Sequence, residues 1–499
     1  MTHIDRRNFL RGFGGTVVGG TALAALESLV PARASELRVT PELVQFRPEM
    51  EPIVRWIEST PRERVFEVAI EQLKRGLSYR QLLGGLFLAG IRNVKPRPVG
   101  FKFHAVMVIN SAHQLALDAT QADRLLPLFW ALDTFKSSQA QDEKEGDWVL
   151  GPVNESAVPN PDRARKLFVE AMDRWDDEAA DVAVAGLCRA AGAGEIAETL
   201  WRYGARDWQN IGHKIIFTAQ AFRVLDTIGW QHAEPVLRSL VFGLLNGGET
   251  DSAAPYAENQ SLVSKVRKDW AAGKPDAVAS IALLQTLRQA KPDDAARAAV
   301  ELLNRGVAAS SVWDAVMLSS GELLMRQPAI VPLHAVTASN SMHYAFRTSG
   351  NDATRLLTLL QACSWTAMFR DGARGRGSLP DKPLIDELQP VEQDKPPSVE
   401  AILHELGKDR LAAARQVLGL ARSADSSALF MDAARHLVFT KGTDSHHYKF
   451  AAAAFEEFRH ANSAWQPHLL AASVFYLRGA TEPDSPLLKR SREALVALS

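Results

Sequence analysis

Apolar residues recur along most of the chain at the three- and four-residue spacing of amphipathic helices. Phe66, Ile70 and Leu73 follow one another at this spacing, just after the capping-box pattern of Thr60–Glu63. Ser78 and Gln81 form a second capping-box pattern. Period-two alternation with β-branched residues, which is typical of strands, is scarce. The pattern therefore predicts an all-α, multi-helical fold.

Two segments of the chain occur twice in related form. The decapeptide His104–His113 shares its His, Ala, Val, Asn, Ser and His with His334–His343, at an offset of 230 residues. The segment His213–Phe222 shares its leading His, both Phe and two Ala with His446–Phe455, at an offset of 233. Two matches at nearly one offset indicate an internal repeat. We expect two diverged halves of about 230 residues, 35–250 and 251–499, packed as a pseudo-twofold unit.

Four of these histidines follow a break in the chain and open an apolar helix. They are His104, His213, His334 and His446. His113 and His343 lie nine residues after the first and third of them, about half a turn out of phase on a helix of about 100° per residue, so one straight helix cannot aim both at one ion. We therefore predict that the four helix-opening histidines converge on a metal, and that His113 and His343 form hydrogen bonds elsewhere in the core. The alternative is that all of them are structural.

Composition narrows the chemistry. The 499-residue chain has 57 Lys and Arg against 58 Asp and Glu, without basic runs interleaved with aromatic residues, so we do not expect nucleic acid as a partner. Its two cysteines, Cys188 and Cys363, exclude a disulfide scaffold, an all-cysteine zinc site and a cysteine-held iron–sulfur cluster. A metal would have to be held by histidines and oxygen ligands.

The N-terminus resembles an export signal. Asp5-Arg6-Arg7-Asn8-Phe9-Leu10 is similar to the twin-arginine motif, and Ala32-Arg33-Ala34 suits a cleavage site, which predicts a signal peptide over residues 1–34. The resemblance implies the twin-arginine translocase as a partner, export of a folded protein, and a periplasmic or secreted location. No later stretch reaches the 18 apolar residues of a membrane span, so we expect no stable membrane anchor.

Lys449 lies one helical turn after His446, where the first half has Ile216. A protonated lysine would be repelled by a metal ion, so Lys449 either points into solvent or has lost its charge. Reaction with carbon dioxide would convert it to a carbamate, which is an anionic oxygen ligand. Four neutral imidazoles give a divalent ion no charge compensation, so such a ligand would be useful.

Three short motifs together resemble the questin oxidase-like family of anthraquinone-processing oxygenases. They are Phe101-Lys-Phe-His104, His334-Ala-Val-Thr337, and the Asp444, His446 and Lys449 spacing. The resemblance implies an all-helical protein with a non-haem iron, held by His104, His213, His334, His446 and a carbamylated Lys449, and oxygenative ring cleavage. Fungal members often have a further histidine where this chain has Val108, and they lack an export signal, so their substrate is not carried over.

These observations predict an exported non-haem iron oxygenase that acts on an organic small molecule, with aromatic molecules as candidates, and uses dioxygen. Imidazole and oxygen ligands suit Fe(II), and Zn, Cu and Mn remain alternatives. Two other classes compete with this hypothesis: a non-catalytic helical scaffold or binding protein, and a zinc hydrolase that uses the same histidines. A flavin or nicotinamide is not expected, because no glycine-rich fingerprint follows a strand. The sequence does not identify catalytic residues.

Overall fold

The computed structural model describes residues 43–248, 254–391 and 397–498. Within them the chain is helical and forms no strand, only one isolated bridge between Lys274 and Val307. The all-α prediction is confirmed. The helices before the first gap are α1 Glu51–Ser59, α2 Val65–Lys74, α3 Tyr79–Asn93, α4 His104–Leu117, α5 Leu126–Lys144, α6 Pro161–Asp173, α7 Asp177–Ala190, α8 Ala193–Gly204, α9 His213–Ile228 and α10 Ala233–Leu244.

The helices after that gap are α11 Ala254–Val263, α12 Ala277–Leu287, α13 Pro292–Asn304, α14 Ala309–Arg326, α15 Ile330–Thr348, α16 Asp352–Arg374, α17 Val399–Glu405, α18 Arg410–Leu420, α19 Ala424–Lys441, α20 Ser445–His460, α21 Gln466–Ser473 and α22 Leu488–Leu498. Short 3₁₀ turns join several of them, including η2 Phe101–Phe103 before α4 and η4 Gln209–Gly212 before α9. The predicted signal peptide 1–34 and the predicted boundary at 250/251 lie outside the described residues.

Local sequence decides where helices begin. Ser78 and Gln81 form the predicted capping box of α3. Thr60 does not form the N-cap of α2: it is the C-cap of α1 and donates a hydrogen bond from Oγ1 to the Trp56 carbonyl, and α2 begins only at Val65. The capping prediction for Thr60–Glu63 was wrong because a 3₁₀ turn, Arg62–Arg64, occupies that segment.

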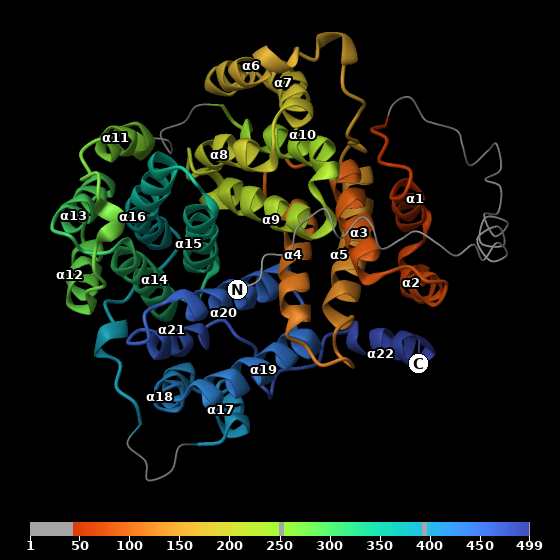
Figure 1. Cartoon of the computed structure of the whole chain (residues 1–499). Coiled ribbons are helices and arrows are strands. Elements are labelled where there is room, and N and C mark those ends of the chain that lie inside the picture. Colours follow the sequence, from red (N-terminus) through yellow and green to blue (C-terminus); the bar gives the residue numbers. More distant parts are fainter. Residues whose placement is uncertain (1–42, 249–253, 392–396, 499) are drawn as a thin grey trace, which may run out of the picture. The chain divides into compact units, whose positions relative to one another are not determined.

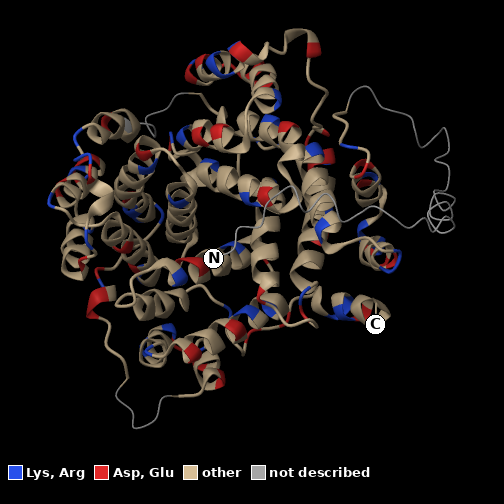
Figure 2. Cartoon of the chain, in the orientation of Figure 1, with Lys and Arg blue, Asp and Glu red and all other residues tan. Residues whose placement is uncertain are grey.

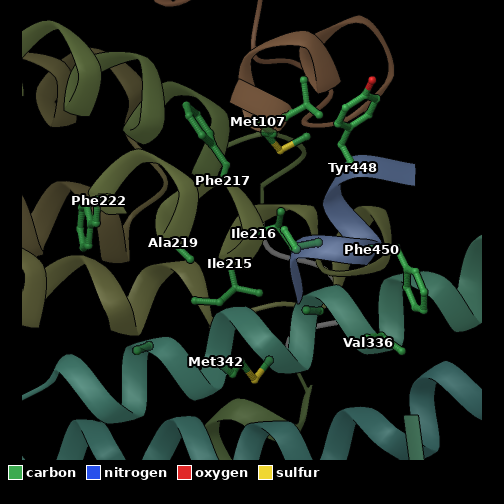
Figure 3. Close-up of a cluster of buried hydrophobic side chains, with 14 of the residues drawn as sticks. Met107, Ile215, Ile216, Phe217, Ala219, Phe222, Val336, Met342, Tyr448 and Phe450 are labelled. Atoms are coloured by element: carbon green, nitrogen blue, oxygen red, sulfur yellow. The ribbon is translucent and has the colours of Figure 1, made fainter. Parts of the chain in front are cut away.

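Four helices form the centre of the structure. α4 packs against α9 and α20, and α15 packs against the same two, so the four surround a common point (Figure 1). Apolar side chains fill the space between them, among them Met107, Ile216, Val336 and Phe450 (Figure 3). Acidic and basic residues lie mainly on the helices that surround this centre (Figure 2).

Several packing contacts among the helices from α3 to α10 recur among those from α14 to α21. α3 packs on α4 and α10, as α14 does on α15 and α21. α9 packs on α4, α8 and α10, as α20 does on α15, α19 and α21. In this arrangement α4 lies opposite α15 and α9 lies opposite α20 (Figure 1); the duplication stays a prediction. In the described part of the chain, no helix combines the length and hydropathy required to cross a bilayer.

Gly212 lets α9 begin close to α15. It has a φ of +79°, and a Cβ on it would lie 2.9 Å from the Ala338 Cβ and 3.1 Å from Trp365. Ala338 is one turn beyond His334 in α15, so this contact brings the start of α9 next to the helix that carries His334.

Gly212→Ala should therefore destabilise the protein in two ways. A left-handed backbone costs a residue with a Cβ about 1–2 kcal/mol, and overpacking costs about 1–3 kcal/mol more. The control is Gly248→Ala, where φ is +68° and a Cβ would meet nothing within 4 Å, so only the first cost applies. The measurement is the urea midpoint of each variant. Equal losses would show that the contact with α15 does not require glycine.

Candidate metal centre

Each of the four central helices carries one of the four predicted ligand histidines near its N-terminus. His104 and His213 are the first residues of α4 and α9, and His446 is the second residue of α20. His334 is the fifth residue of α15, not the first, because the helix already begins at Ile330. Pro332 falls in that first turn, where a missing backbone N–H leaves no hydrogen bond unmade. The prediction of a helix opening at His334 was wrong by one turn.

The four imidazoles converge. His213 Nε2 lies 2.9 Å from His104 Nε2 and 2.9 Å from His334 Nε2. One ligand atom from each of the four histidines can be chosen so that all lie within 4.8 Å of one another, and the group could hold a metal ion. The ring centroids follow the order 104, 213, 334, 446 with neighbours 4.4 to 5.1 Å apart. His104 and His334 are opposite corners, 6.3 Å apart.

Every Nδ1 atom of the cluster has a hydrogen-bond acceptor of its own. The acceptors are the Phe101 carbonyl (2.7 Å) for His104, the Asn210 carbonyl for His213, the Ile330 carbonyl (2.6 Å) for His334 and Asp444 Oδ1 (2.5 Å) for His446. A carbonyl or carboxylate oxygen can only accept, so each Nδ1 carries the proton. The Nε2 atoms then have lone pairs and no proton, which is the form in which imidazole binds metals.

Strained backbone supplies two of these carbonyls. Phe101 has a φ of +48°, and Asn210 and Ile211 have φ values of +54° and +52°. Residues with a Cβ rarely adopt this left-handed region, and it costs of the order of 1–3 kcal/mol at each position. The turns place the carbonyl three residues before His104 and His213 against the Nδ1 atom. Gly100 allows a further close approach, since a Cβ there would lie 3.2 Å from the His213 ring.

The surroundings keep the imidazoles neutral. Burial holds the pKa values of His104, His213 and His334 well below the usual value, and it lowers that of His446. Repulsion from Lys449 lowers all four further. The positive ends of the helix dipoles act in the same direction. Neutral rings with Nε2 lone pairs 2.9 Å apart cannot hydrogen-bond to each other, and a cation between them would remove their repulsion. The donor set therefore fits a metal ion.

Lys449 of α20 is buried near the cluster, close enough to affect the pKa values of all four histidines. The residue is 1% exposed, and neither its Nζ nor the neighbouring His446 Nε2 has a hydrogen-bond partner. Burial lowers the pKa of Lys449 to about 7, although the Asp444 carboxylate opposes the shift. Although burial would raise the pKa of Asp444, hydrogen bonds from His446 hold it below the usual range. Lys449 is thus directed away from solvent, as required of a ligand and unlike a solvated helix lysine.

The two remaining repeat histidines lie outside the cluster. His113 Nδ1 is 3.2 Å from the Tyr79 hydroxyl, and His343 Nδ1 is 2.7 Å from Glu457 Oε2. Both make hydrogen bonds elsewhere in the core, as the helix phase predicts. Sequence reasoning did not find the carbonyl acceptors Phe101, Asn210 and Ile330. Their role depends on backbone conformation, for which Gly100 and Gly212 were the available signal.

Comparison of the chain with protein-family models, curated proteins and solved structures gives no match. The resemblance to the questin oxidase-like family therefore stays a prediction from three short motifs.

Asp444→Ala should weaken metal binding through His446. Removing the partner of a ligand imidazole typically costs about 10–100-fold in metal affinity. Asp444 also caps α20, and loss of a cap costs about 1 kcal/mol. Asp276→Ala is the matched control, because Asp276 caps α12 in the same way and is not a partner of the cluster. We expect both variants to lose stability and only Asp444→Ala to lose Co²⁺ affinity in competition with a chelator. Unchanged affinity would show that the carboxylate does not orient His446.

Proposed function

We propose that the protein is an exported non-haem iron oxygenase that oxidises an organic small molecule with dioxygen. The supporting observation is the set of four buried or partly buried imidazoles whose Nδ1 protons are all committed to other acceptors, which leaves four Nε2 lone pairs directed at one point. A scaffold does not need four unprotonated Nε2 atoms gathered at one place, because such atoms can only accept hydrogen bonds and cannot bond to one another.

The shortest nitrogen spacings are compatible with a six-coordinate ion such as Fe(II). With metal–nitrogen bonds of about 2.1 Å, a tetrahedral zinc site needs nitrogens about 3.4 Å apart, whereas neighbouring ligands of a six-coordinate ion lie about 3.0 Å apart. His213 Nε2 is 2.9 Å from two other Nε2 atoms. Neutral nitrogen and anionic oxygen ligands suit Fe(II), and the same set accommodates Mn or Cu. Iron bound there would supply the activation of dioxygen.

Lys449 would supply the anionic ligand. Its buried Nζ would form an N–C bond with carbon dioxide and release a proton, which leaves a carbamate oxygen with a negative charge. A buried amine without a partner is costly, while a carbamate bound to a cation compensates charge on both sides. Ile216 occupies the equivalent place in α9, so only one such ligand is available, and coordination positions remain for dioxygen and substrate.

The four imidazoles would take no part in proton transfer at the site. The four Nδ1–H groups stay bound to their acceptors, so the imidazoles can neither donate nor accept a proton during turnover. The depressed pKa values of His104, His213 and His334 have the same effect. Apolar side chains of the four central helices exclude bulk water, which favours oxidation of a bound organic molecule over release of reduced oxygen.

Metal analysis tests the proposal. Protein is isolated from the cytoplasm of an Arg6→Lys, Arg7→Lys variant, which the export proposal expects to be retained there. We expect close to one iron per chain, and less than about a tenth of an equivalent in His213→Gln or His334→Gln. His436→Gln, an exposed histidine paired with Asp123, is the control and should keep its iron.

Three outcomes would contradict parts of the proposal. Absence of any transition metal from the parent protein would favour the scaffold. Zinc without iron, and no oxygen consumption after iron loading, would favour the hydrolase. Recovery of the Arg6→Lys, Arg7→Lys variant from the periplasm would contradict twin-arginine export but not the metal centre.

Lys449→Ala should bind iron more weakly, and added acetate should restore part of the affinity by placing a carboxylate in the space left by the side chain. Lys449→Met keeps the volume of the side chain and should not respond to acetate. The parent protein prepared with ¹³C-bicarbonate should show a carbamate carbon signal that both variants lack. Equal iron affinity in all three proteins would rule out the carbamate and leave the four-histidine site standing.

A further inference from the structure

A buried ion pair spans the turn before α9. Lys214, the second residue of α9, donates a hydrogen bond from Nζ to Asp207 Oδ2 (2.9 Å), and the two side chains are 0% and 2% exposed. Lys214 Nζ also donates to the Asn246 carbonyl (3.1 Å). Lys214 directly follows His213 in the chain. The ion pair therefore brackets residues 208–213, which include one of the four cluster histidines.

The stability of α9 does not account for this ion pair. The N-terminus of a helix is the positive end of its dipole, so a cation in the first turn is unfavourable. Removing two charges from water is also costly, and a buried ion pair is often no more stabilising than apolar residues of similar volume. In some proteins such a pair instead fixes one conformation. The turn bracketed by Lys214 and Asp207 has a conformation that needs fixing.

Three successive residues of this turn have left-handed backbone. Asn210, Ile211 and Gly212 have φ values of +54°, +52° and +79°. Glycine adopts this region readily, whereas a β-branched isoleucine does so rarely. The Asn210 side chain does not hold the turn, because its Nδ2 is buried without a hydrogen-bond partner among the described residues. Contacts on either side of these three residues must therefore maintain the conformation.

Asp207 supplies such a contact at both ends of the turn. Its Oδ1 accepts the backbone N–H of Gln209 (3.0 Å), while its Oδ2 accepts from Lys214. The side chain of a helical residue points toward the helix N-terminus, so Lys214 reaches back over the turn to this carboxylate. The Asn210 carbonyl, which accepts the Nδ1 proton of His213, lies between the two attachment points in the chain.

The turn before α20 is held from the equivalent position. His447 follows His446, and it matches Lys214 at the offset of 233 residues. His447 Nδ1 accepts the backbone N–H groups of Thr443 (3.2 Å) and Asp444 (3.3 Å). Asp444 is the residue whose carboxylate accepts the Nδ1 proton of His446. In both turns, the residue after the cluster histidine is bonded to the segment that carries the acceptor of that histidine.

We propose that Asp207 and Lys214 are positioning residues of the metal centre, which aim His213 by holding the turn that contains the Asn210 carbonyl. The inference rests on the proposed function, since it requires a metal at the four histidines. It deepens that function by adding two residues, outside the cluster, on which the affinity for the metal depends.

The test measures Co²⁺ binding to the full chain by competition with a chelator and by visible absorption. Lys214→Met keeps most of the side-chain length and removes the ion pair. We expect the affinity to fall at least about tenfold and the spectrum to change, because His213 loses its fixed orientation. Lys136→Met is the matched control, since Lys136 is also buried and donates to backbone carbonyls, those of Ile57 and Glu58 at the end of α1. It should lower the urea midpoint and leave the affinity and the spectrum unchanged.

A second variant separates positioning from folding. Asp207→Asn with Lys214→Met leaves no unpaired charge in the interior and keeps an oxygen that can accept from Gln209. We expect a urea midpoint near that of the parent protein and the same loss of Co²⁺ affinity as in Lys214→Met. Parent-like affinity and spectrum in both variants would overturn the positioning role, as would an equal loss in Lys136→Met. If the parent protein binds neither iron nor Co²⁺, the proposed metal centre itself is wrong.

Discussion

The hydrogen bond from each Nδ1 to a fixed oxygen is the interaction on which the centre depends. It sets the tautomer, fixes the plane of the ring and commits the Nε2 lone pair to the common point. Three of the four acceptors are backbone carbonyls, so the orientation of the rings is tied to the turns before α4 and α9 and to the first turn of α15. The strained residues Phe101, Asn210 and Ile211 are the cost of this arrangement.

A metal ion in this arrangement would create an electrostatic problem, which the proposed carbamate of Lys449 would address. Four neutral rings, four helix N-termini and a divalent ion would together contain no negative charge. The Asp444 carboxylate would be separated from the ion by the His446 ring. A protonated lysine would add to the problem, and its burial without a partner already disfavours the charged form. Conversion to a carbamate would change the sign of this contribution at a position where the first half has Ile216.

The sequence predicted the fold class, and its register identified the four histidines that the structure brings together. The internal repeat carried this information. Only the first histidine of each decapeptide has a histidine at the matching place in the second pair of segments, so this alignment excludes His113 and His343. Helix phase excludes the same two residues. The failures were local. Thr60 has the pattern of a helix cap but ends the preceding helix, and α15 begins one turn earlier than Pro332 suggests. The carbonyls of Phe101 and Ile330 could not be predicted, because any residue has a carbonyl and only the backbone conformation decides where it points.

If the predicted duplication holds, joining the halves in one chain has a physical benefit. In a symmetric dimer every residue on the twofold axis faces its own copy, so a lysine beside the metal would occur twice and occupy both remaining sides. Arg223 and Glu456 show the same freedom: they lie 233 residues apart, the offset of the second repeat pair, and form an ion pair of 2.7 Å. Identical halves would place two arginines or two glutamates there. A single chain lets equivalent positions diverge, and in the proposed centre this would allow one side of the histidine cluster to provide a charged ligand while the other stays apolar.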